Sequence, residues 1–191
     1  MSPLSRDEII AKIRANASLA GIDLTKVDLS YESLKGADLS GLDLREAHLQ
    51  NANLEGANLQ KTNLAGAFLF GCNLFHANLN GADLRETNMQ DCNLDEAQLR
   101  NVQGEHVALF GSSLEKADLT GADLRRGRMK RTNLRYAVLN GANLQQAHLE
   151  RSDLTQASCK NTDLSHANLT NSRLEGTDLH EAVLDGTIGL S

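Results

Sequence analysis

The side chains with the most chemical potential in this chain are six histidines and three cysteines. Imidazole and thiolate groups bind transition metals when several of them converge on one point, and a cysteine beside a histidine can act as a nucleophile. The histidines are spread along the sequence, at His48, His76, His106, His148, His166 and His180. Whether any of these groups meet therefore depends on the fold that positions them.

A leucine recurs at every fifth residue from Leu19 to Leu184, and no insertion breaks the spacing. Alanine dominates the position two residues before the leucine, Asp or Asn precedes it directly, and polar residues follow it. A five-residue period fits neither a helix nor a strand, whose periods are near 3.6 and 2. It is typical of a solenoid, in which each unit stacks on its neighbours because it cannot bury its apolar residues alone. The leucine register is interrupted only at Met89, Gly104, Met129 and Cys159.

Two stretches show the repeat most clearly, from Ala52 to Gly56 and from Ala142 to Gln146. The sequence of residues 17–187 resembles the pentapeptide-repeat family, whose repeat is A(D/N)LXX. The resemblance implies an all-β solenoid, a right-handed quadrilateral β-helix with four pentapeptides in each coil.

Two residue series with a period of twenty support four repeats per coil. The small inward residue of one side is alanine without a break from Ala17 to Ala157, and a corner is rich in glycine and asparagine. Gly and Asn tolerate positive φ, so we expect one corner of nearly every coil to contain such a turn. Residues 17–187 then form about eight coils, and stacking at about 4.8 Å gives a rod about 40 Å long. The corner series is Gly21, Gly41, Gly81, Asn101, Gly121, Gly141 and Asn161.

Three segments are expected. Residues 1–16 are predicted to form a capping helix over one open end of the solenoid, with Ser5 and Glu8 at capping-box spacing and an apolar stripe that includes Ile13. A partner-binding helix is the alternative. Residues 17–187 form a single continuous β-helix, and residues 188–191 a C-terminal tail.

Two departures from the repeat, at Gly104 and Glu32, have structural consequences. Gly104, within the weak repeats of residues 101–107, replaces a central leucine, and Val102 and Val107 are large enough to refill the gap. This segment is either a tolerated defect or an in-register seam between two shorter repeat segments. Glu32 occupies a small inward site, which predicts a distorted first coil that lets the carboxylate reach water.

Two groups of outward residues are candidate interaction surfaces. Grouped exposed aromatic residues are a sign of a contact surface, although scattered ones are ordinary. A basic run can bind an anionic partner. However, Arg85, Glu105 and Arg125 alternate in sign along one side, so a salt-bridge ladder is the competing interpretation. The aromatic group is Phe68, Phe70, Phe75 and Phe110, and the basic run is Arg125, Arg126, Arg128, Lys130, Arg131 and Arg135.

In this fold the histidines face outward and lie too far apart to share an ion, so no metal or other cofactor is expected. The cysteines occupy inward sites as small apolar fillers. Cys72 and Cys92 stack, but their parallel Cβ vectors predict free thiols because a disulfide needs closer Cβ atoms. Carboxylates on a convex rod have no cleft that could shift their pKa values, so we do not expect an enzyme.

The composition restricts the location and the partners of the protein. The net charge is −6, no long apolar run is present, and the first residues lack the apolar core of a signal peptide. We expect a cytoplasmic protein with no membrane partner, monomeric or weakly associated end to end through its C-terminal end. The predicted function is a non-catalytic rigid scaffold that binds another protein.

The resemblance admits an alternative function. Some pentapeptide-repeat proteins mimic duplex DNA and act on a type II topoisomerase such as gyrase. Here positive and negative residues are interleaved, so nucleic acid is not the expected partner and a DNA mimic is not the favoured interpretation.

Overall fold

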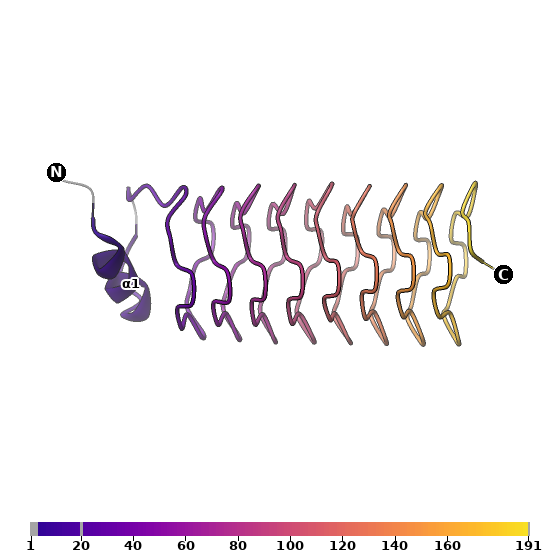
Figure 1. Cartoon of the computed structure of the whole chain (residues 1–191), viewed down its shortest axis with the longest axis horizontal. Helices are drawn as coiled ribbons and strands as arrows, with labels where there is room; N and C mark the ends of the chain where they lie inside the picture. The colour runs from indigo at the N-terminus through magenta and orange to yellow at the C-terminus, as the bar shows by residue number, and fades with distance from the viewer. Residues whose placement is uncertain (1–3, 20, 191) are drawn as a thin grey trace.

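The protein is an elongated rod of stacked coils (Figure 1). The computed structural model describes residues 4–19 and 21–190. Within these residues there is one helix, α1 (Arg6–Arg14), and no extended strand, because the coils pair through isolated parallel bridges. Each bridge joins a residue to the one twenty positions later, as from Asp38 to Asn58 and on to Asn78. The predicted period of twenty residues per coil is confirmed.

Each coil has four sides, and each side is one pentapeptide. We number the sides by their central residues. The first side contains Leu39 and Leu59, the second Leu44 and Leu64, the third Leu49 and Leu69, and the fourth Leu54 and Leu74, each continuing at steps of twenty. The columns that result decide which side chains lie next to one another along the rod.

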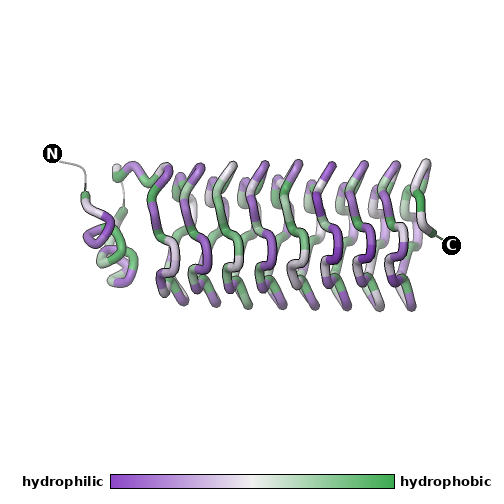
Figure 2. Tube along the Cα trace, in the orientation of Figure 1, coloured by the Kyte–Doolittle hydropathy of each residue, from purple (hydrophilic) through white to green (hydrophobic). Residues whose placement is uncertain are grey.

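The central leucines and the small residues that precede them fill the interior. Leu59, Leu79 and Ala77 have no exposed surface, and the tube in Figure 2 changes repeatedly between hydrophobic and hydrophilic residues. Where a hydroxyl replaces the inward alanine, it donates to a carbonyl of the neighbouring coil, as Thr62 Oγ1 does to the Leu39 carbonyl over 2.8 Å. The interior is therefore a narrow column of side chains closed to the surrounding solvent.

Where Asp or Asn precedes the leucine, it has a local role. Asp38 Oδ1 accepts the backbone N–H of Ser40 at 3.1 Å, and Asn58 Oδ1 accepts that of Gln60 at 3.2 Å. This side-chain bond to the backbone two residues later is the Asx turn, which holds the chain as it approaches a corner. The preference for these two residue types follows from that bond.

Positive φ occurs at the predicted corner, as at Gly41 and Asn101, and at the other three corners as well. Non-glycine residues adopt φ between 55° and 57° at Lys61, Glu46, Asn51 and His76, one for each side. The backbone ladder fixes them, because the corner N–H donates to the next coil, as Lys61 N does to the Asn80 carbonyl at 3.0 Å. The left-handed conformation costs an ordinary residue about 1–2 kcal/mol, so tertiary hydrogen bonds impose these corners.

Helix α1 lies at one end of the rod (Figure 1). Ser5 and Glu8 form the predicted capping box, and Ile9, Ile10 and Ile13 are buried in the same cluster as the first leucines. The Glu32 side chain is 17% exposed, so it reaches the surface as expected, and two arginines of α1 also bind it there. Its carboxylate oxygens contact Arg6 Nη2 at 2.8 Å and Arg14 Nη2 at 2.7 Å. The inward-site carboxylate therefore fastens α1 to the first coil.

Gly104 does not leave a gap. A Cβ placed there would lie 3.0 Å from Leu124 Cδ2 and 3.5 Å from Val107 Cγ1, so these side chains already occupy the space. Val107 was one of the two valines expected to refill the gap, and the other, Val102, is buried in the same core cluster. Gly104 N still donates to the Asp123 carbonyl at 2.7 Å, and the ladder continues through this coil.

The coil at the other end of the described chain is less buried. Leu174, Leu179 and Leu184 are only partly buried there, and Val183 and Ile188 are exposed. The one helix of the described residues, α1, is too short to span a membrane.

Candidate interaction surfaces

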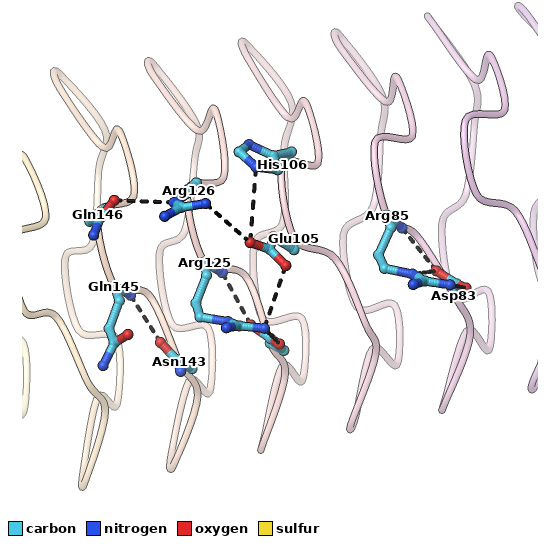
Figure 3. Close-up of polar contacts among 10 residues, drawn as sticks. Asp83, Arg85, Glu105, His106, Arg125, Arg126, Asn143, Gln145 and Gln146 are labelled. Atoms are coloured by element: carbon cyan, nitrogen blue, oxygen red, sulfur yellow. Dashed lines mark hydrogen bonds and ion pairs between the residues drawn. The ribbon is translucent and has the colours of Figure 1, made fainter.

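The second side holds the charged ladder that the alternation of signs predicted, but over a shorter distance (Figure 3). Arg125 Nη2 lies 3.5 Å from Glu105 Oε2 and 2.8 Å from Asp123 Oδ2. Arg126 Nη1 lies 3.6 Å from Glu105 Oε1, and its Nε donates to Gln146 Oε1 at 3.1 Å. These two exposed arginines are thus paired with carboxylates of the protein itself.

Arg85 does not extend the ladder to Glu105. It pairs instead with Asp83 of its own repeat, at 2.5 Å (Figure 3). The hydrogen bond from Arg85 lowers the pKa of Asp83, and Arg125 lowers the pKa of Asp123 in the same way. An arginine two residues after the aspartate therefore neutralises each carboxylate locally, a pattern that also joins Arg45 to Asp43.

The basic run divides between three sides. Arg125 and Arg126 belong to the second side, and Arg135 on the fourth side lies 3.5 Å from Asp153 Oδ2. Arg128 and Lys130 are on the third side, where their side chains make no ion pair or hydrogen bond with any described residue.

Arg131 lies at the corner that follows the third side. Its guanidinium carbon is 5.8 Å from the centre of the Phe110 ring. It too lacks an ion pair within the described residues. The third side and its corner therefore hold the three cations of the run that the protein leaves without a carboxylate.

Most of the aromatic group shares this third side. Phe68 and Phe70 are 40% and 43% exposed, and Phe110 follows in the column of Phe70. The ring of His48 stacks on Phe68 with centroids 5.1 Å apart. Phe75 differs, because it lies on the fourth side with its ring 3.9 Å from that of His76.

A hollow of about 450 Å³ lies on the third side between the aromatic and basic groups. Glu150 Oε2 is buried there without a hydrogen-bond partner. Three of the lining residues, Gln90, His148 and Glu150, were not among the predicted surface residues. Their spacing of twenty residues from Phe110, Arg128 and Lys130 could have identified them. The hollow is lined by Gln90, Phe110, Arg128, Lys130, His148 and Glu150.

In the described part of the chain, no group of three or more His, Cys, Asp or Glu side chains could hold a metal ion. Cys72 and Cys92 are buried free thiols, as predicted, and donate to the Leu49 and Leu69 carbonyls at 2.8 and 2.9 Å. Hydrogen bonding with Cys72 and burial raise the pKa of Cys92, and burial raises that of Cys159 to about 12. Such thiols are poor nucleophiles at neutral pH.

Fold and surface together define a solenoid of five-residue repeats whose polar groups lie on flat outer sides. The sequence matches the family model for pentapeptide repeats in eight copies, over residues 37–74, 69–103, 112–151, 132–171 and 147–186. The chain belongs to the pentapeptide-repeat family.

Solved structures of two other proteins are similar to this chain. HetL, a pentapeptide repeat protein involved in heterocyst differentiation regulation in the cyanobacterium Nostoc, is 28% identical, with 98% of this chain and 97% of HetL covered and a TM-score of 0.43. QnrB1, a plasmid-mediated fluoroquinolone resistance protein, is 21% identical, with 81% and 87% covered and a TM-score of 0.57. The likeness to QnrB1 shows the fold alone. A search of curated proteins found no match.

Proposed function

We propose that the protein is a rigid, non-catalytic scaffold that binds another protein through one flat side. In this proposal, residues 17–187 form a continuous right-handed, four-sided β-helix of about eight coils, residues 1–16 cap one end, and residues 188–191 are a tail. The observation that supports it best is the continuous ladder between coils, which holds every outward side chain on a stiff column. Stiffness of this kind lowers the entropy cost of binding.

The state of the carboxylates supports the non-catalytic part of the proposal. A general acid or base at neutral pH needs a pKa near that pH. Asp43, Asp83 and Asp123 instead have lowered pKa values because an arginine of the same repeat donates to each of them. They remain ionised and paired, which suits a structural role.

Site-specific photo-crosslinking tests the scaffold function. A photoreactive amino acid is placed at one outward position on each side, and the full-length protein is irradiated in cells of its source. We expect adducts of defined mass from one side or two adjoining sides. Equal labelling of all four sides, or no adduct from any side, would contradict the proposal. The four positions are Gln60, Gln145, Gln50 and Thr155 for the first to fourth sides.

A DNA mimic that acts on gyrase is the second candidate. The observation in its favour is the fold shared with QnrB1, a fluoroquinolone resistance protein. A mimic must present a continuous negative surface. Arginines interrupt the acidic columns here, as Arg85 and Arg125 do on the second side. This pairing makes the protein-binding scaffold the better supported function.

A further inference from the structure

We propose that the partner binds the third side as an extended, acidic segment of protein with apolar side chains among its carboxylates. The inference rests on the proposed scaffold function and adds to it which side binds and what chemistry is bound. The surface, called here the third-side strip, runs from His48 and Phe68 through Phe110 to Lys130 and Arg151.

The cations of the strip select carboxylates. Arg128 and Lys130 have exposed side chains without an ion pair, and Arg151 lies in the column of Arg131 with none either, among the residues that the structure describes. Arg125 and Arg126, only a few residues earlier, are both satisfied by Glu105. The protein thus neutralises the second-side cations and leaves those of the third side available to an external anion.

The aromatic residues of the strip select apolar groups. Phe68 and Phe70 are both exposed on this side, the ring of His48 stacks on Phe68, and Phe110 lies two coils beyond Phe70 in the same column, with Gln90 between them. An isolated exposed phenylalanine needs no explanation, whereas several exposed aromatic residues grouped on one side are a sign of a contact surface. Arg131 above the Phe110 ring joins this apolar part to the basic part.

The hollow between the two parts suits the backbone of a peptide. Glu150 Oε2 is a buried acceptor without a donor, and Gln90 offers an amide on the opposite side of Phe110. A polypeptide supplies N–H donors and carbonyl acceptors at regular intervals, so it can satisfy both groups.

The dimensions of the strip fit a short stretch of chain. Phe70 and Lys130 are three coils apart, or about 14 Å at about 4.8 Å per coil. About four or five extended residues cover that distance, at about 3.3 Å per residue.

A nucleic acid fits the same strip less well. The unpaired cations occupy two adjacent coils only, whereas a nucleic-acid backbone carries phosphates along its whole length. Beyond them, the strip presents Phe68 and Phe70 rather than further cations, and Glu150 would face the phosphates. One or two carboxylates match the cations better.

Selection from a display library of random short peptides against the full-length protein tests the inference. We expect the enriched peptides to combine Asp or Glu with aromatic or aliphatic residues. Affinity of the best peptide should fall about tenfold or more in Lys130→Glu and in Phe70→Ser. Lys61→Glu is the matched control, since it changes the net charge equally at an exposed lysine on the first side that also has no ion pair among the described residues.

Each other outcome would overturn the inference. If Lys61→Glu lowered the affinity for the peptide as much as Lys130→Glu, only the net charge would matter. If Phe70→Ser kept full affinity, the proposed apolar contact would be wrong. An acidic protein segment would be excluded if basic peptides were enriched or if no peptide was enriched. It would also be excluded if a single-stranded oligonucleotide bound more tightly than the best peptide. Photo-adducts from another side alone would refute the third-side strip and leave the scaffold function intact, whereas their absence from every side would refute both. Unchanged melting temperatures show that the variants are folded.

Discussion

The leucine column carries the stability of the rod at the scale of single residues. Leu79 has no exposed surface, and burying a leucine is worth about 1.5–3 kcal/mol. Leu79→Asp also places an unpaired charge in a closed interior, so we expect it to abolish the cooperative thermal transition. Asn80→Asp, one residue later on the outside, should shift the melting temperature little. Equal shifts in the two variants would contradict the inward assignment.

The arginine–aspartate pairs of the second side predict how stability depends on pH. The pKa values of Asp83 and Asp123 are lower in the folded protein than the usual value of about 4, because Arg85 and Arg125 donate to them. Their stabilisation is complete above pH 4 and is lost as the pH falls through the lowered folded pKa.

Urea unfolding between pH 7 and pH 2 measures this dependence. We expect the free energy of unfolding to fall most steeply below pH 4. The double variant Arg85→Gln/Arg125→Gln should show a smaller fall, since its aspartates keep pKa values closer to those of the unfolded chain. Parallel curves for the two proteins would show that the pairs contribute nothing to the acid sensitivity.

At the scale of elements, α1 depends on one carboxylate of the first coil. Glu32 binds both Arg6 and Arg14, so Glu32→Ala should free the two ends of the helix together. We expect faster amide exchange in residues 6–14 and a loss of about 1 kcal/mol in stability, because partly exposed ion pairs are worth about 0–1 kcal/mol each. Exchange in the central coils should not change.

Glu55→Ala provides the control for α1, since it removes a single exposed pair with Lys35 on the fourth side. Its effect on exchange in residues 6–14 should be negligible. Unaltered protection of the helix in Glu32→Ala would mean that the apolar contacts of Ile9, Ile10 and Ile13 hold it without the ion pairs.

The elements were predictable to different degrees from the sequence, for physical reasons. The coil was readable because one leucine per repeat must point inward, and the capping box of Ser5 and Glu8 is a local signal. The role of Glu32 was not readable, because its partners come from α1. The positive φ of residues such as Lys61 was missed because hydrogen bonds between coils impose it on residues that do not favour it.

The candidate surface was predictable only in part. The residues of the basic run were evident, but their pairing depends on side-chain reach between coils. Arg125 and Arg126 both reach Glu105, whereas Arg128 and Lys130 reach no carboxylate among the described residues. The hollow was missed because it arises between columns, where no motif marks it.

At the scale of the whole molecule, the distribution of charge predicts the outcome of a gyrase assay. The net charge is −6, but arginines divide the acidic columns and the third-side cations would repel a DNA-binding groove. We expect neither inhibition of DNA gyrase supercoiling nor protection from quinolones at micromolar protein. The DNA mimic would be supported instead by salt-sensitive inhibition of gyrase that weakens when acidic residues between positions 17 and 100 are replaced by basic ones.

The twenty-residue coil also determines which changes in chain length the protein can accept. Inserting one pentapeptide within residues 81–105 moves every later residue to the next side, so Phe70 and Lys130 would come to lie a quarter turn apart around the rod axis. Inserting four pentapeptides keeps them on one side and adds only about 4.8 Å between them. Both variants should fold, since each preserves the leucine register, and circular dichroism can verify this. Only the longer insertion should still bind an acidic peptide, one lengthened by about one or two residues to span the added distance.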